Sequence, residues 1–385
     1  MAHVLVVEGK YTGSLSLVAA AQQAGHQVTF VAHDPTPYLK GVELAQTPLH
    51  QARVLAGVRT GDVAELLEAA DQLHREHPIE ACVTVSEQHL QGTAAVADHF
   101  GLIHESPASV ARLRDKHVVR TVLGRAGIPQ PRFAFAESAD QAVRAAQVIG
   151  LPVVVKPIDG SGSIDVAVLA TLADVRAHAE AIRGRQEYGR SVRSRGQMLV
   201  EQFVAGPLVS VELLTQQGRH HVYGCTDKVV DPITGTVELG GTFPADLGEA
   251  EQAVLATAID AVTALGIQNA LSHTELILGP TGPVIVEVNG RLVGGPVPEA
   301  AELVLARSMY ADLLDLHLGR PVPPPRTTGA VTLRAVVVRR AGRLRQLELA
   351  DLVTEGVADL SLQDRRPGDW VQPPISNRDR LGFLA

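Results

Sequence analysis

Short apolar runs alternate with helical patterns over the first hundred residues of the chain. Strands are predicted at 4–7, 28–32 and 81–85, and helices at 14–24, 62–75 and 88–100. This alternation predicts a parallel, doubly wound sheet. The first strand-to-helix turn, EGKYTG, has neither the G-x-G-x-x-G nor the P-loop spacing. We therefore expect this region to be a scaffold that forms one wall of a substrate site, and nucleotide binding there is the less favoured alternative.

After this region, the pattern changes to longer helices and antiparallel strands. Helices are predicted at 107–126, 138–149, 173–183, 249–265 and 298–318, and strands at 129–135, 153–157, 164–170, 198–204, 208–215, 220–230 and 236–239. A hairpin follows at 271–289, a mobile polar loop is expected at 184–196, and the segment 329–385 contributes further strands. The fold class predicted is therefore α/β and α+β multidomain.

Length and composition indicate an ordinary globular protein of several compact units. The chain has 385 residues, a formal net charge of −8 and 3% aromatic residues. The negative net charge argues against binding to the phosphate backbone of nucleic acids, and the few aromatic residues argue against stacking on bases. Two cysteines, Cys82 and Cys225, favour a reducing compartment. The N-terminus predicts a strand instead of a signal peptide, and no apolar run is long enough to cross a membrane. We expect a cytoplasmic protein with no membrane partner.

Two acidic residues in the segment 273–291 give the sharpest chemical signal. A hairpin centred on Thr281 places Glu275 directly opposite Glu287. Opposed residues have Cβ atoms about 5 Å apart, and two like charges at that distance repel by roughly 3 kcal/mol at an effective dielectric constant near 20. The alternative is a register slipped by one or two residues, with both acids exposed on a sheet edge.

A divalent cation would resolve this repulsion. Because side chains alternate along a strand, His273 and Asn289 share the face of Glu275 and Glu287. Two carboxylates and an amide oxygen suit Mg²⁺, which commonly also binds waters and substrate phosphates. Arg291 would then face an anion held by the metal, such as a transferring phosphoryl group.

Several weaker signals come earlier in the chain. Lys156 ends an apolar strand, where a lysine is seldom buried unless it meets an anion. The turn 159–163, DGSGS, offers flexible N–H groups that could close over phosphates. Considered alone, Lys116 would be interpreted as a surface cation. The segment 201–204, EQFV, would likewise be interpreted as an ordinary strand. Their order along the chain is more informative than any one of them.

Together these residues resemble the ATP-grasp superfamily, and most closely its L-amino-acid ligase branch, which includes bacilysin-type dipeptide synthetases. The elements that carry the resemblance are Lys116, VVVKP at 153–157, DGSGS at 159–163, EQFV at 201–204, VSVE at 209–212, Glu275 and EVNGR at 287–291. The resemblance covers nearly the whole chain. It implies an ATP-grasp fold with an N-terminal Rossmann-like domain and a nucleotide held between two lobes. The expected domains are 1–105 (Rossmann-like), 106–195 (small lobe with glycine-rich lid), 196–320 (large lobe with metal site) and 321–385 (C-terminal strands).

The resemblance also implies roles for individual residues. Binding of ATP is assigned to Lys116, Lys156, Gly160, Ser161, Gly162, Ser163, Glu201, Gln202, Val204, Glu212 and Lys228, with Glu201, Gln202 and Val204 at the adenine and Glu212 as the nearest candidate for the ribose-binding acid. The metal ligands implied are Glu275, Glu287 and Asn289, for one or two Mg²⁺ ions that Mn²⁺ could replace. Catalytic roles fall to Arg291, Lys156 and Arg334, with Arg334 as a second anion contact. Gly241 stands where many relatives carry a histidine.

The reaction implied is an ATP-dependent joining of a carboxylate to an amine through an acyl phosphate, with release of ADP and phosphate. Small-molecule substrates, amino acids above all, are the expected partners, and a homodimer is an assembly that the sequence allows. Glu299 could attract an ammonium group, although a solvated glutamate at a helix start is the preferred interpretation. The alternatives are another ATP-grasp enzyme, either biotin-carboxylase-like or a purine-pathway ligase, and an ATP-binding regulatory protein without turnover.

Overall fold

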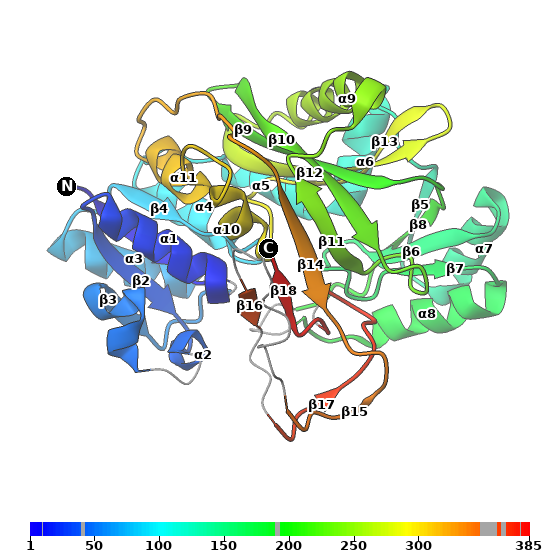
Figure 1. Ribbon diagram of the computed structural model, residues 1–385, viewed down its shortest axis with the longest axis horizontal. Helices are drawn as coiled ribbons and strands as arrows, with labels where there is room; N and C mark the ends of the chain where they lie inside the picture. The colour runs from blue at the N-terminus through cyan, green and yellow to red at the C-terminus, as the bar shows by residue number, and fades with distance from the viewer. Residues whose placement is uncertain (10, 40–42, 189–192, 347–359, 363–366, 378) are drawn as a thin grey trace.

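The computed structural model describes the chain apart from residues 10, 40–42, 189–192, 347–359, 363–366 and 378. Three main sheets organise the described residues (Figure 1). An N-terminal sheet and a small antiparallel sheet lie at opposite ends of the molecule, and a large sheet lies between them. Four residues of the predicted mobile loop, 189–192, fall outside the described residues.

The N-terminal sheet is parallel, with strand order β3-β2-β1-β4. Its strands are β1 (His3–Val7), β2 (Gln27–Ala32), β3 (Arg53–Ala56) and β4 (Ala81–Val83); its helices are α1 (Tyr11–Gln23), α2 (Thr36–Leu39), α3 (Val63–Glu76) and α4 (Leu90–His99), with 3-10 turns at Leu44–Gln46 and Pro48–Gln51. Val4 and Val6 pack in the cluster that contains α1, whereas Leu5 packs with α3 and α4. Strand alternation therefore buries both faces, as predicted. Strand β3 was not predicted, because its sequence RVLA is short and only half-buried.

The small sheet carries two helices on one face. Its strands are β5 (Phe133–Ala136), β6 (Val153–Pro157), β7 (Ala167–Leu169) and β8 (Met198–Gln202), in the order β5-β8-β6-β7, and its helices are α7 (Ala139–Ile149) and α8 (Leu172–Gly184). Because β8 pairs with β5 and β6, this sheet extends to Gln202. The chain crosses from the small sheet to the large sheet at 203–207, and the lobe boundary at 195 stays a prediction. The boundaries at 105 and 320 stay predictions.

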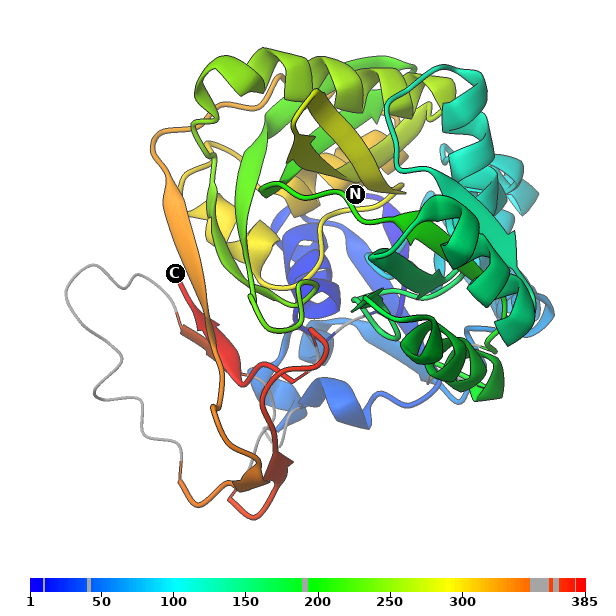
Figure 2. The ribbon, with the colours of Figure 1, turned by 90° about the vertical axis from the view of Figure 1, so that its right-hand side faces the viewer.

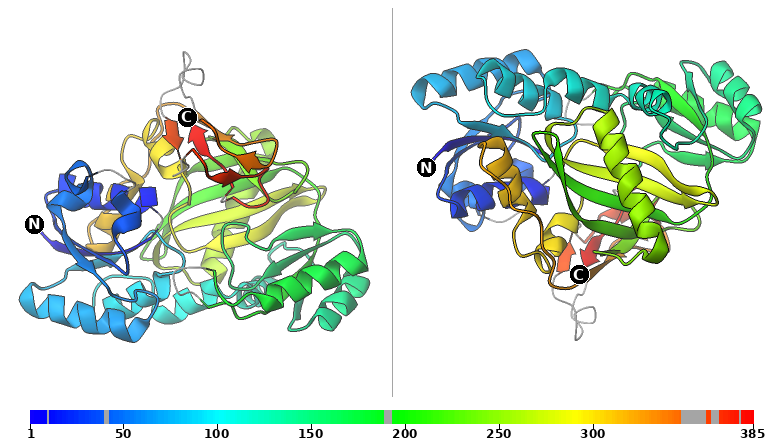
Figure 3. Two further views of the ribbon diagram at one scale, coloured as in Figure 1. Left: turned by 90° about the horizontal axis from the view of Figure 1, so that it is seen from below. Right: turned by 90° about the horizontal axis from the view of Figure 1, so that it is seen from above.

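The large sheet has eight strands in the order β13-β12-β9-β10-β11-β14-β18-β16. These are β9 (Leu208–Gln216), β10 (Arg219–Val230), β11 (Glu238–Phe243), β12 (Asn269–Gly279), β13 (Gly282–Asn289), β14 (Val331–Val336), β16 (Leu360–Leu362) and β18 (Gly382–Leu384); β15 (Gly342–Arg343) and β17 (Trp370–Val371) form a separate pair, and a 3-10 turn covers Gly248–Ala250. The helix α9 (Glu251–Ala264) packs across one face through Val254, Ala258 and Val262 (Figure 3). The C-terminal strands extend the sheet along its far edge (Figure 2).

Two long helices predicted from the sequence are each broken in the structure. The segment 107–126 forms α5 (Pro107–Arg114) and α6 (Lys116–Arg125). Asp115 separates them, because its carboxylate accepts hydrogen bonds from the backbone N–H groups of His117 (3.0 Å) and Val118 (3.1 Å) and so caps α6. This break makes Lys116 the first residue of a helix.

The segment 298–318 is likewise two helices, α10 (Val297–Glu302) and α11 (Met309–His317). Ser308 caps α11 by accepting a hydrogen bond from the N–H of Tyr310 at 3.2 Å, and Leu305 pairs with Thr327 in the interval between the helices. Across the described ranges, every helix is too short or too polar to cross a lipid bilayer.

Candidate active site

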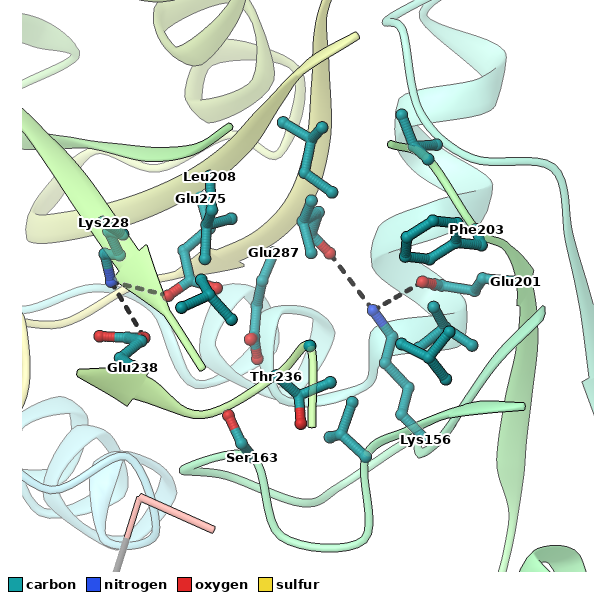
Figure 4. Close-up of a pocket in the computed structure, with 18 of the residues that line it drawn as sticks. Lys156, Ser163, Glu201, Phe203, Leu208, Lys228, Thr236, Glu238, Glu275 and Glu287 are labelled. Carbon is teal, nitrogen blue, oxygen red and sulfur yellow. Dashed lines mark hydrogen bonds and ion pairs between the residues drawn. The ribbon is translucent and has the colours of Figure 1, made fainter. Parts of the chain in front are cut away.

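Two adjoining cavities lie where the small and large sheets face each other. The larger, of about 420 Å³, has an apolar wall that includes Val154 and Ile277. Phe203 and Leu208 belong to the same wall (Figure 4). The smaller, of about 110 Å³, is bounded by residues of the N-terminal domain, the large sheet and the C-terminal segment. Six residues line both cavities: Gly162, Ser163, Lys228, Glu238, Glu275 and Glu287. The cavities therefore meet at the two predicted metal-binding carboxylates.

The hairpin β12–β13 opposes those carboxylates as the sequence predicts. Glu275 pairs with Glu287, and His273 pairs with Asn289. The predicted register is wrong between this pair and the turn, because Leu276 pairs with Ile285 and leaves Val286 as an extra residue. The turn contains only residues 280 and 281, and this bulge restores the register beyond it.

The bulge also changes which side chains face the larger cavity. Val286 and Glu287 are consecutive, yet both line it. In a regular strand, consecutive side chains would point to opposite faces. The extra residue thus adds Val286 to the cavity wall beside Glu287, and the Val286 carbonyl accepts hydrogen bonds from Lys156 (3.3 Å) and Arg120 (2.6 Å).

Lysines neutralise both acids. Lys228 Nζ lies 3.0 Å from Glu275 and 3.1 Å from Glu238, and Lys116 Nζ lies 3.0 Å from Glu287. Burial by itself would lower the pKa of Lys228, but Glu238 and Glu275 together raise it above its ordinary value. For Glu275, burial would raise the pKa, whereas Lys228 and His273 hold it well below the ordinary value. Both side chains therefore stay charged at neutral pH.

Beneath Glu275 lies a buried histidine between two carboxylates. His273 Nδ1 is 2.8 Å from Glu212, and His273 Nε2 is 3.1 Å from Glu275. Burial opposes its positive charge, but Glu212 outweighs burial and the pKa of His273 rises to about 9. Glu212 lies behind this imidazole and lines neither cavity. Its strand register directs it to His273, and its role as the ribose-binding acid stays a prediction.

Lys156 and Glu201 form a second buried cluster at the crossing between the lobes. Glu201 accepts from Arg120 Nε at 2.7 Å and lies 2.8 Å from Lys156 Nζ. Burial would raise the pKa of Glu201, but Arg120 and Lys156 lower it to about 2. The Glu201 side chain is thus engaged by two cations, and Gln202 and Val204 line the larger cavity beside it. Arg120 was not predicted, since on a helix it has no local signal.

A third buried cluster, also not predicted, holds Arg291. Glu87 lies 3.0 Å from Arg291 and 2.5 Å from Arg114. Burial would raise the pKa of Glu87, but the two arginines lower it to about 2. Glu87 follows β4 at the carboxyl edge of the parallel sheet, a place where α/β proteins gather ligand-binding groups. That position is the signal that could have identified it.

The glycine-rich turn borders both cavities. Gly160 and Ser161 line the larger one, and Gly162 and Ser163 line both. A Cβ on Gly160 would come within 2.7 Å of Pro157 Cγ. Lys116 Nζ donates to the Gly160 carbonyl at 2.7 Å. The turn is therefore held close to the strand that precedes it.

Two other predicted residues are placed differently. Arg334 on β14 is exposed and lines neither cavity, while its neighbour Leu333 lines the smaller one. Strand alternation turns Arg334 to the outer face, and its anion contact stays a prediction. Glu299 is not a solvated helix-start residue, because its Oε1 accepts from Ser16 (2.9 Å) and Tyr310 (2.7 Å).

The donor set fits a nucleotide-borne magnesium ion. No three His, Cys, Asp or Glu side chains cluster as metal ligands within the described ranges. Glu275 and Glu287 nevertheless supply two opposed carboxylates, and Asn289 lines the same cavity. A lysine ammonium group contacts each carboxylate, Lys228 at Glu275 and Lys116 at Glu287, so each carboxylate already binds a positive charge. Mg²⁺ bound to phosphate oxygens and water needs only one or two protein carboxylates.

Comparisons with known proteins show what the chain is similar to. Residues 149–298 match the family described as ATP-grasp domain. An uncharacterised protein, y4rH of Sinorhizobium fredii, is 27% identical over 99% of this chain and 78% of its own length. Dapdiamide A synthase of Enterobacter agglomerans is 26% identical over 80% of this chain and 72% of its own length.

A solved structure shares the fold throughout. The L-amino acid ligase of Bacillus licheniformis superposes with a TM-score of 0.82, covers 100% of this chain and 92% of that chain, and is 20% identical. Residues 149–298 therefore carry an ATP-grasp domain, and the whole chain shares its fold with an L-amino acid ligase.

Proposed function

We propose that the protein is an ADP-forming carboxylate–amine ligase, with ATP in the larger cavity and two small substrates in the smaller. The observation that carries this proposal is that the two cavities meet at Glu275 and Glu287. A phosphoryl group passing from nucleotide to substrate must cross such a junction. Opposed carboxylates there would hold the Mg²⁺ that neutralises the transferring oxygens.

The larger cavity suits a nucleotide in both its apolar and its charged parts. Phe203, which is 38% exposed, and Leu208 offer flat apolar surface for a base. Lys116 and Lys156 lie farther in, with the glycine-rich turn beside them. In this proposal both lysines bind phosphate oxygens, and Gln202 and Val204 contact adenine.

The chemistry proposed has two steps. An oxygen of the substrate carboxylate attacks the γ-phosphorus, and the bond from that phosphorus to the β,γ-bridging oxygen breaks as ADP leaves. The amine nitrogen then attacks the acyl carbon, the bond from carbon to the phosphate oxygen breaks, and the amine loses a proton. Arg291, held by Glu87, would bind the phosphoryl oxygens in both steps. Closure of the site around bound substrates would exclude water, which would hydrolyse an acyl phosphate.

Amino acids are the substrates that we propose. An L-amino acid ligase shares the fold over the whole chain, and a dapdiamide synthase is among the relatives. The smaller cavity supports this choice, because its lining mixes cations and carboxylates suited to zwitterions.

The test is ADP release with Mg²⁺ATP and a panel of the twenty amino acids, singly and in pairs. We expect release above background with at least one pair, and a product mass equal to the pair minus water. Glu287→Gln should reduce turnover at least a hundredfold, whereas the matched control Glu180→Gln, at an exposed site on α8, should not change it. ADP formation that no amino acid stimulates would refute the proposal.

A further inference from the structure

A buried arginine from the C-terminal segment lines the smaller cavity. Arg380 has 9% of its surface exposed. Its Nε donates to the Asn377 carbonyl at 2.9 Å, its Nη1 donates to the Glu238 carbonyl at 3.1 Å, and its guanidinium lies 4.6 Å from the centre of the Phe383 ring. These contacts fix the plane of the guanidinium before any ligand arrives.

Arg380 forms no ion pair within the described part of the chain, and the nearby Glu238, which favours its positive charge, is itself paired with Lys228. The other lysine and arginine side chains that line this cavity, Lys228 and Arg291, are each paired with a carboxylate. The neighbouring Asp379 accepts hydrogen bonds from Ser376 instead. Nη2 of Arg380 has no acceptor among the described residues. A cation this deeply buried is costly unless an anion compensates it.

The turn that carries Arg380 is tied to both sides of the cavity. Asn377 donates to Ser163 of the glycine-rich turn at 3.4 Å, and its side-chain oxygen accepts from the N–H of Glu238 at 3.0 Å. Arg380 is therefore placed against the loop that borders the nucleotide cavity and against β11.

Arg380 and Arg291 approach the cavity from separate parts of the large sheet. Arg291 follows β13 and Arg380 precedes β18, and five strands lie between β13 and β18 in the sheet order. Arg291 stands beside Asn289 and the acid pair, where phosphoryl transfer is proposed. A substrate carboxylate that does not react needs a cation away from the site of phosphoryl transfer, and Arg380 supplies one.

We propose that Arg380 binds the carboxylate of the acceptor substrate, so that the acceptor is an amino acid and not a simple amine. This inference rests on the proposed ligase function and specifies one of its substrates. A guanidinium matches a carboxylate through paired N–H donors. Anchoring the acceptor by its carboxylate leaves its amine free to reach the acyl carbon.

The experiment compares L-alanine with L-alaninamide as acceptors, using the donor that gives the most ADP in the amino-acid panel. L-Alaninamide has no carboxylate and can act only as an acceptor. The wild-type protein should prefer L-alanine by about tenfold to a hundredfold in kcat/KM, the range of one charge-assisted contact. Arg380→Gln should abolish that preference by raising KM for L-alanine. The value of kcat/KM for L-alaninamide should be unchanged.

Controls separate a local effect from misfolding. Arg380→Lys should retain part of the preference, and Arg144→Gln, at an exposed arginine of α7, should retain all of it. ATP affinity should be the same in all variants. An unchanged preference in Arg380→Gln, or a raised KM for the donor with L-alaninamide, would overturn the inference while the ligase function stands. A wild-type protein without amino-acid-stimulated ADP release would instead refute the proposed function and this inference together.

Discussion

Replacing Glu201 with glutamine removes the charge that holds two buried cations and changes the side-chain volume very little. Glu201 and Arg120 are each 2% exposed, and Lys156 is 5% exposed. The carboxylate contacts Arg120 at 2.7 Å and 3.2 Å and Lys156 at 2.8 Å. Without it, two positive charges remain buried side by side.

Two routes give the size of the effect. Breaking a buried ion pair by removing one partner costs about 3–5 kcal/mol. Independently, the pKa of Glu201 falls from 4.5 to about 2 in the folded protein. At 1.36 kcal/mol per pH unit, this difference corresponds to about 3 kcal/mol of folding free energy. We therefore expect Glu201→Gln to lower the free energy of unfolding by about 3 kcal/mol at pH 7.

The same linkage fixes the direction of the pH dependence. Because the folded pKa of Glu201 is depressed, its contribution is complete above pH 4.5 and is lost as the pH falls toward 2. Urea unfolding of the wild-type protein, Glu201→Gln and the exposed control Glu180→Gln should be followed at pH 7 and pH 3. The difference between wild-type and Glu201→Gln should shrink at pH 3. A loss below about 1 kcal/mol at pH 7, or a loss that does not shrink on acidification, would refute the reasoning.

Other predictions concern the site directly. Glu87→Gln should lower kcat at least tenfold in the ADP-release assay without changing ATP affinity, because Arg291 loses its ion-pair partner; an unchanged kcat would contradict the positioning role. Gly160→Ala should raise KM for ATP several-fold, since the added Cβ would lie 2.7 Å from Pro157 Cγ; a normal KM would show that the turn yields easily. Chelation by EDTA should stop ADP release and leave the urea midpoint unchanged, and activity that survives it would remove Mg²⁺ from the site.

The sequence predicted the acid pair because it is a local feature of one hairpin. The alternating pattern of β12 and β13 is enough to place Glu275 opposite Glu287. The sequence could not predict the bulge at Val286. A two-residue turn with a bulge and a three-residue turn without one both set Glu275 opposite Glu287, so the pattern does not distinguish them. Nor could it find Arg120, whose partners include Glu201 and the Ile285 carbonyl, both far away in the sequence.

The positions of Arg334 and Arg380 relative to the cavities could not be predicted from the sequence for a similar reason. Which face of β14 meets the cavity depends on its register against β11, where Gly240 pairs with Arg334. Sequence order along one strand does not fix that register. Arg380 lies in a polar tail without an alternating pattern, and only the folding of that tail onto β11 and Ser163 brings it to the cavity. The helix breaks at Asp115 and Ser308 were missed because both are single capping residues within long helical patterns.

The bulge at Val286 has a consequence for changes in the length of the β12–β13 turn. A three-residue turn with no bulge would also set Glu275 opposite Glu287, so lengthening the turn and deleting Val286 compensate each other in register. The deletion would, however, remove the Val286 carbonyl, which accepts hydrogen bonds from Lys156 and Arg120. An insertion in this turn paired with that deletion would therefore keep the acids aligned but remove one contact between this hairpin and the buried cations at the crossing between the lobes.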